Sequence, residues 1–101
     1  MMINNMRPIH PGEMLREDFL IPLGMSAHAL AMAIHVPVQR INDIVREKRS
    51  LSPDFVLRLP RYFGTTPEFW MNLQSAFDLR TAQIGKMADI ERVVRPRDRA
   101  A

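Results

Sequence analysis

Apolar residues recur at helical spacing along most of this chain, and prolines and glycines separate one periodic stretch from the next. No stretch alternates between apolar and polar residues for long enough to predict a strand. The pattern therefore predicts an all-α fold, in which five helices pack together and a short helical extension follows. The predicted helices span residues 13–20, 27–34, 37–46, 53–63 and 67–84.

Capping residues predict where these helices begin. Ser26 is a favoured N-cap, and the helix after it is so uniformly small and apolar that most of its circumference must be buried. Pro37 suits the first position of the next helix, because its missing N–H would have no partner there. The triplets 52–54 and 66–68 each place a capping hydroxyl directly before a proline, which predicts two further helix starts.

Proline and glycine also predict where the helices end. Pro22 and Gly24 should end the first helix, Gly64 the fourth and Gly85 the fifth. Pro60 lies inside the fourth helix, where a proline removes one hydrogen bond and normally costs about 3 kcal/mol. We therefore expect a kink or a distorted turn at that position.

Two apolar stripes lie in the last third of the chain. The spacing of the first favours packing in the core over a platform for stacking bases. The second is so short that its isolated helix would be marginal in water, so it packs either within the chain or against a second protomer. The first stripe is Trp70, Leu73, Phe77 and Ile84, and the second is Met87, Ile90 and Val94.

Composition limits the class of protein. The 101 residues fit one domain, and an apolar content of 47% is ordinary for a globular protein. Cysteine is absent, which excludes disulfides, thiolate metal ligands and a cysteine nucleophile. The apolar runs fall far short of the ~20 residues of a membrane span, and we expect a cytoplasmic protein without a signal peptide. We expect a flexible arm at residues 1–7, one domain at 8–84, and a helical extension with a basic tail at 85–101.

The third predicted helix carries the most informative chemistry. Apolar residues fall on one side of its helical wheel, and polar groups suited to the edges of bases in a major groove fall on the other. The outward side consists of Gln39, Asn42, Asp43 and Arg46, with Val38 and Arg40 on its flanks. Lys48 and Arg49 follow where cations would contact the sugar-phosphate backbone. A net charge of +3 permits nucleic-acid binding, although an ordinary solvated face has the same composition.

Titratable residues elsewhere do not indicate catalysis. The three histidines have no third ligand at metal-binding spacing, and the carboxylates of the first helix have no nucleophile or base beside them. We expect His35 in the turn before the third helix and His10 in the approach to the first. We expect no metal, no cofactor and no enzyme activity.

Several motifs resemble known families. Six short motifs resemble the helix–turn–helix of lambda-repressor-like (Cro/C1-type, XRE) proteins. They are Gly24-Met25-Ser26, Ala29-Leu30-Ala31, Val36-Pro37, Arg40-Ile41, Ile44-Val45 and Lys48-Arg49. The flanking segments 7–13 (RPIHPGE) and 61–70 (RYFGTTPEFW) are similar to the HigA/VapI group of addiction-module antitoxins. The resemblance covers about residues 7–83.

This resemblance implies a function that the residue pattern alone does not reach. Antitoxins of the HigA type neutralise a HigB toxin, a RelE-like ribonuclease that cuts mRNA at the ribosome. They also repress their own operon by binding a palindromic operator, normally as homodimers. By position, the resemblance assigns base contacts to Val38, Gln39, Arg40, Asn42, Asp43 and Arg46, and phosphate contacts to Lys48 and Arg49.

Two residues depart from the family pattern. Glu47 stands where a glycine often follows the recognition helix, so a left-handed backbone there would be strained and a negative charge would lie near phosphates. Pro60 stands where alanine is usual. Two alternatives stay open: a transcription regulator without a toxin, and a module that sequesters a protein partner and binds DNA weakly.

Overall fold

The computed structural model describes residues 7–98, and this part of the chain contains helices and no strands. The all-α prediction is confirmed. The predictions for residues 1–6 of the N-terminal segment and for Arg99 in the basic tail concern residues outside the described part of the chain. In chain order the elements are α1 (Pro11–Met14), the π-helical η1 (Leu15–Leu20), α2 (Ile21–Leu23), α3 (Ala27–Ile34), α4 (Val38–Val45), α5 (Pro53–Phe63) and α6 (Pro67–Val93).

The first three elements form one continuous helix, which begins at Pro11, before the predicted start. Pro22 does not end this helix, contrary to the prediction. The π-helical turns widen the segment before it, where the Ile21 amide donates to the Arg16 carbonyl, and a widened turn accommodates a proline ring that a regular turn would not. Gly24 ends the helix in the left-handed conformation, with φ of 61°.

The remaining caps follow the sequence closely. Ser52 Oγ accepts a hydrogen bond from the Phe55 amide at 3.2 Å and begins α5, while Gly64 ends it with φ of 77°. Pro37 is the N-cap of α4 and has an extended backbone, so α4 begins at Val38, one residue later than predicted. The predicted distortion at Pro60 does not interrupt α5, because its buried ring packs in the core in place of the missing hydrogen bond.

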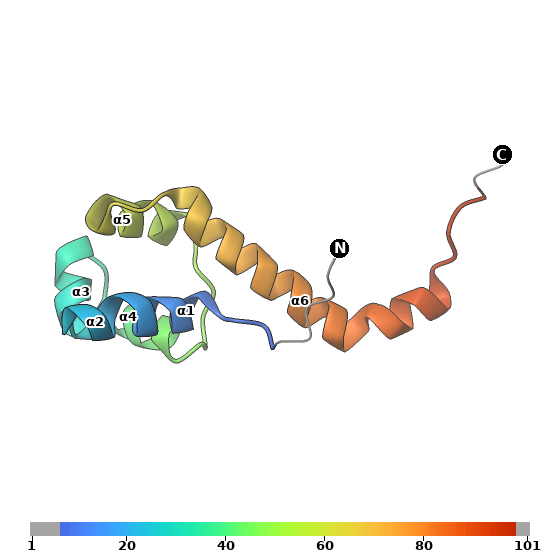
Figure 1. Ribbon diagram of the computed structural model, residues 1–101, viewed down its shortest axis with the longest axis horizontal. Coiled ribbons are helices and arrows are strands. Elements are labelled where there is room, and N and C mark those ends of the chain that lie inside the picture. The colour runs from blue at the N-terminus through green and yellow to red at the C-terminus, as the bar shows by residue number, and fades with distance from the viewer. Residues whose placement is uncertain (1–6, 99–101) are drawn as a thin grey trace.

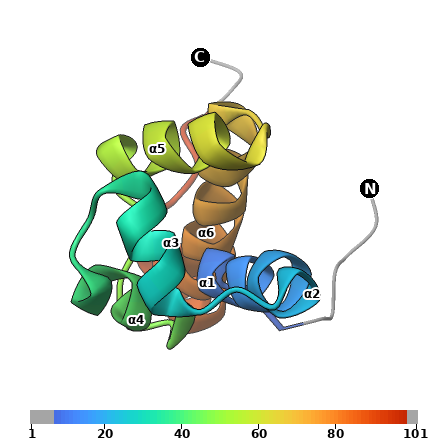
Figure 2. The ribbon, with the colours of Figure 1, turned by 90° about the vertical axis from the view of Figure 1, so that its left-hand side faces the viewer.

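The core gathers apolar side chains from the helical segments between α1 and the first half of α6, except α2, whose three residues are exposed. Helix α3 packs against α4 and α5, and α1 packs against α4 and α6. The end-on view of Figure 2 shows these helices clustered around α6. Trp70 is fully buried, as predicted, and its indole N–H donates to Thr65 Oγ1 at 2.8 Å. The fully buried apolar side chains include Leu15, Leu30, Ile41, Phe55, Leu59 and Trp70.

Helix α6 is a single helix of 27 residues, and the predicted break at Gly85 is wrong. A glycine inside a helix costs only about 1 kcal/mol, which 26 other helical residues readily offset. Every residue from 81 to 98 is exposed, so Ile84, at 60%, is not part of the core stripe. Figure 1 shows this half of α6 bending and projecting as an arm from the other helices, and the structure measures 57 × 25 × 24 Å.

The arm carries the second apolar stripe, and its position decides one open question. Met87, Ile90 and Val94 are all exposed, which contradicts packing within the chain. Across residues 7–98, no helix combines the length and the apolarity that crossing a bilayer requires.

Candidate nucleic-acid interface

Helices α3 and α4 are joined by a tight turn whose residues determine the angle between them. Ser26 Oγ caps α3 by accepting a hydrogen bond from the Ala29 amide at 3.0 Å. His35 ends α3 in the left-handed conformation, with φ of 61°, and the Val36 amide donates back to the Ala31 carbonyl. The prediction that His35 lies in the turn is confirmed. The chain reverses here, so that α4 packs against α3.

Helix α4 buries one side and presents the other to solvent. Ile41 and Ile44 are fully buried beneath it. On the opposite side Gln39 and Arg46 are exposed, and the Gln39 Nε2 donates to Asp43 Oδ1 at 2.8 Å. This bond fixes the Gln39 amide, so that its carbonyl oxygen and its second hydrogen keep a defined direction for a base edge.

The other predicted base-contacting residues lie around the same side. Val38 is 40% exposed at the start of α4, and Asn42 is half-buried. Arg40 lies on the side of α4 that faces α5, with its guanidinium 3.8 Å from the Asp54 carboxylate. The structure therefore brings Gln39, Asn42, Asp43 and Arg46 to the outer side of α4, leaves Val38 exposed on one flank, and turns Arg40 on the other flank toward α5.

The loop after α4 carries the two predicted phosphate-contacting cations. Lys48 and Arg49 are exposed, and neither forms an ion pair within residues 7–98. Glu47 adopts the left-handed conformation, with φ of 64°, as expected for a position where glycine is usual. The Lys48 amide donates to the Asp43 carbonyl at 2.8 Å, which closes the turn after α4.

Arg16 in η1 contacts this loop, a role that its sequence pattern does not indicate. Its guanidinium donates to the backbone carbonyl of Val45, one of the carbonyls that the end of α4 leaves without a helical partner. The same group lies 3.5 Å from the Glu47 carboxylate. Arg16 also pairs with Glu17 at 2.9 Å, so it offsets part of the negative charge that Glu47 brings near the cations of the loop. No local signal could have revealed this contact, because Arg16 and Val45 lie 29 residues apart.

His10 connects α1, the same loop and α6. Its buried imidazole accepts a hydrogen bond from the Gly12 amide at 2.8 Å and meets the Phe77 ring edge-on, with 4.8 Å between the ring centroids. The Arg49 backbone lies close enough to the imidazole to affect its pKa. Burial lowers the pKa of His10 below its ordinary value, because desolvation disfavours the charged imidazolium. His10 precedes a proline just as Ser52 does, and this shared pattern could have identified it as a cap.

Gly12 sits where α1 meets the end of α4. A Cβ atom built on Gly12 would lie 1.7 Å from the Ile44 carbonyl oxygen, so only glycine permits this approach. The position of α4 therefore depends on α1 as well as on α3. Among the described residues, no three His, Asp or Glu side chains are placed to hold a metal ion.

Helix α3 buries one side only, with Met32 65% exposed, and not most of its circumference as predicted. A short helix packed along one side, a left-handed turn and a second helix with a polar outer side define a helix–turn–helix protein. Residues 15–70 match the family model described as Helix-turn-helix. The chain belongs to this family and, within it, to the group that includes the HigA antitoxins.

Known relatives resemble the chain over most of its length. Virulence-associated protein I of Dichelobacter nodosus is 54% identical over 85 residues, which are 84% of this chain and 79% of that protein. The solved structure of the Pseudomonas aeruginosa antitoxin HigA with the higBA promoter has a TM-score of 0.89 and 49% identity, and the match covers 91% of this chain and all of that one. The structure of the antitoxin GraA in complex with its operator has a TM-score of 0.87 and 50% identity, and the match covers 95% of this chain and 97% of that one.

Proposed function

We propose that this protein is a homodimeric antitoxin that binds a palindromic operator, represses its own operon and neutralises a HigB-like, mRNA-cleaving toxin. The observation that carries the proposal is the outer side of α4, where a fixed amide and an exposed guanidinium stand beside a loop with two unpaired cations. The similarity to antitoxins solved with a promoter and with an operator supports the DNA-binding half of the proposal.

Base contacts are assigned to the residues that face outward from α4. Gln39 would pair with adenine, whereas Arg46 would pair with guanine, and each good bidentate contact contributes about 1–3 kcal/mol of discrimination. Val38, Asn42 and Asp43 surround these two and complete the contact surface. Lys48 and Arg49 would contact phosphates and orient α4 without contributing to sequence discrimination.

The arm of α6 supports the homodimer. The radius of gyration of the chain is 17.3 Å, against about 13 Å for a compact chain of this length, and the projecting part of α6, exposed among the described residues, accounts for the excess. At about 100° per residue, four exposed apolar side chains on the arm and in the turn just before it fall within an arc of about 80°. They are Leu79, Met87, Ile90 and Val94. Two such arms paired about a two-fold axis would place two copies of α4 on two half-sites.

Sequence-specific binding is tested with the DNA upstream of the coding sequence and with an unrelated duplex of equal length. Gln39→Ala should weaken binding to the upstream DNA by about 5- to 150-fold for each protomer bound, which corresponds to about 1–3 kcal/mol per contact, and leave the unrelated duplex unaffected. Asn72→Ala removes an exposed amide from α6 and serves as the matched control. Equal affinity of the wild type for both duplexes would refute the proposal.

The homodimer is tested by sedimentation equilibrium. Ile90→Glu places a charge in the apolar arc of the arm and should convert dimers to monomers. Leu57→Glu makes the same change at an exposed apolar site on α5 and should leave the dimer intact. A wild-type protein that sediments as a monomer at micromolar concentration would refute this assignment.

The antitoxin role is tested by co-expression with any short basic reading frame immediately upstream. Co-purification and loss of its mRNA cleavage would support neutralisation. A chain with no such neighbour but with specific DNA binding would be a transcription regulator without a toxin. Arg16 offsets part of the charge of Glu47, which weakens the main argument for the sequestering alternative.

A further inference from the structure

We propose that Arg40 and Arg49 together form a binding site for one backbone phosphate of duplex DNA, so that Arg40 contacts a phosphate and not a base edge. The site lies beside the recognition surface, between α4 and the start of α5. The inference rests on the proposed DNA binding and specifies how one part of the interface works.

The direction of the Arg40 side chain is the first argument. At about 100° per residue, Arg40 lies about 40° around α4 from Ile44, whose side chain is buried, and about 100° from Gln39, which is exposed. Its side chain is half-buried, unlike that of Arg46 on the outer side. When the outer side of α4, which carries Gln39, faces the base edges of a major groove, a residue at this angle faces the sugar-phosphate backbone beside the groove.

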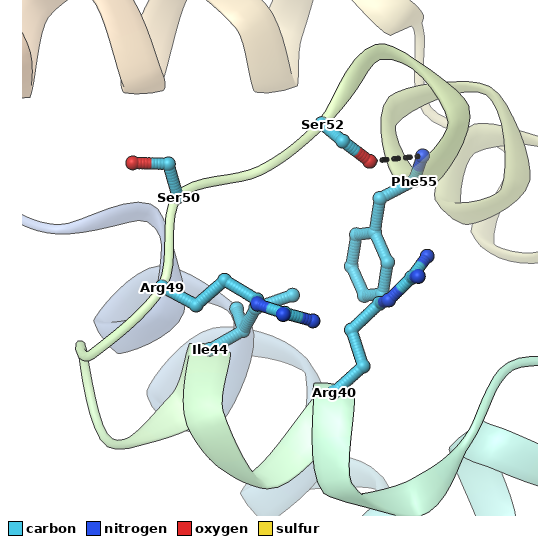
Figure 3. Close-up of a pocket in the computed structure, with 6 residues that line it drawn as sticks. All are labelled: Arg40, Ile44, Arg49, Ser50, Ser52 and Phe55. Atoms are coloured by element: carbon cyan, nitrogen blue, oxygen red, sulfur yellow. Dashed lines mark hydrogen bonds between the residues drawn. The ribbon is translucent and has the colours of Figure 1, made fainter.

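A cavity between α4 and α5 is the second argument. It encloses about 240 Å³, below the about 300–1,000 Å³ of typical small-molecule pockets, and so suits a single anionic group. Figure 3 shows Arg40, from α4, and Arg49, from the following loop, both extending toward this space. The cavity is lined by Arg40, Ile44, Arg49, Ser50, Ser52 and Phe55.

The charges around the cavity are the third argument. Arg49 forms no ion pair within the described part of the chain, and Arg40 makes only a long contact of 3.8 Å with Asp54. Asp54 is held instead by Arg58, whose Nε lies 2.8 Å from the same carboxylate oxygen. Arg40 can therefore turn from Asp54 to a phosphate without leaving that carboxylate unpaired. Two guanidinium groups around one anion are typical of phosphate recognition, because each donates two parallel hydrogen bonds.

Salt dependence separates a phosphate contact from a base contact. Removing one phosphate contact lowers the magnitude of the slope of log K against log salt by about 0.9. For each protomer bound, binding thus weakens about eightfold at 0.1 M salt and about threefold at 0.3 M. Arg40→Met should show this loss equally on the upstream DNA and on the unrelated duplex. Arg40→Lys should keep the slope, because it keeps the charge. Arg61→Met, which removes an exposed charge from the far end of α5, should change neither slope nor affinity.

A duplex scanned with single neutral methylphosphonates locates the contact. In the wild type, one neutralised phosphate per half-site should reproduce the loss seen with Arg40→Met, and in that variant the same position should have no further effect. Loss of affinity for the upstream DNA alone, with an unchanged salt slope, would identify Arg40 as a base-contacting residue and overturn the proposal. An unchanged affinity for both duplexes would overturn it as well.

The same experiment distinguishes failure of this site from failure of the proposed function. A wild type that binds both duplexes equally refutes sequence-specific recognition, yet its salt slope still tests the Arg40 contact. A wild type with no salt-dependent binding to either duplex refutes both.

Discussion

Gly12→Ala tests whether α1 positions the recognition helix. The added methyl group would lie 1.7 Å from the Ile44 carbonyl oxygen, and ordinary contact begins at 3.4 Å, so the two backbones must separate by the difference of 1.7 Å. Neither atom belongs to a flexible side chain, so the strain cannot be relieved locally. We expect a loss of about 3 kcal/mol in the free energy of unfolding, at the upper end of the usual range for overpacking.

Urea denaturation followed by circular dichroism measures this loss. With a slope of about 1.5 kcal/mol/M for a chain of this size, the midpoint should fall by about 2 M at equal protein concentration. Because α4 must shift, specific DNA binding should also weaken in the protein that remains folded.

Gly85→Ala is the matched control for the same chemical change. No atom lies within 4 Å of a Cβ at this position, and the residue is inside α6. Alanine should therefore stabilise the arm by about 0.5–1 kcal/mol through its higher helix propensity, and should not lower the free energy of unfolding of the core. A Gly12→Ala protein as stable as the wild type, with unchanged DNA binding, would show that α1 does not determine the position of α4.

Three further predictions concern polar contacts of the core and the loop. Burial keeps the pKa of His10 below its unfolded value, so its contribution to the free energy of unfolding should be complete above about pH 6.5 and fall as the pH drops through that value toward the folded pKa. Urea midpoints from pH 5 to 8 measure this dependence. The same dependence of the midpoint on pH in His10→Asn would contradict it. Gln74→Leu should cost about 1–3 kcal/mol by calorimetry, because the buried Leu51 amide loses its acceptor, and a neutral effect would refute that role. Arg16→Met should cost about 1 kcal/mol and weaken DNA binding, and adding Glu47→Gly should restore part of both losses; no restoration would mean that the two residues act independently.

Local signals in the sequence were sufficient for most of the fold. Ser26 and Ser52 cap the helices they were expected to cap, because a capping hydroxyl acts on amides two or three residues away. The predictions that Pro22 and Gly85 end helices are wrong, because their effect does not depend on the neighbouring residues in sequence alone. Whether a proline or a glycine ends a helix depends on the turns around it, and a π-helical segment or a long helix can accommodate either residue.

The candidate site divides along the same line. The outward direction of Gln39 follows from helical periodicity, which needs only the residues of α4. The roles of Gly12 in α1 and Arg16 in η1 depend on these elements meeting the end of α4, a contact between segments about 30 residues apart in sequence. Arg40 is the intermediate case, since its angle on the helix was predictable but the cavity that it faces belongs to α5.

The projecting half of α6 separates folding from assembly in this molecule. Its turns are held by their own backbone hydrogen bonds, so in a lone protomer they can fray without disturbing the residues around Trp70. Amide protons along the arm would then exchange with solvent far faster than those of the core. Slow exchange along the arm would be a direct sign of a bound neighbour, read from the same molecule whose core reports on global unfolding.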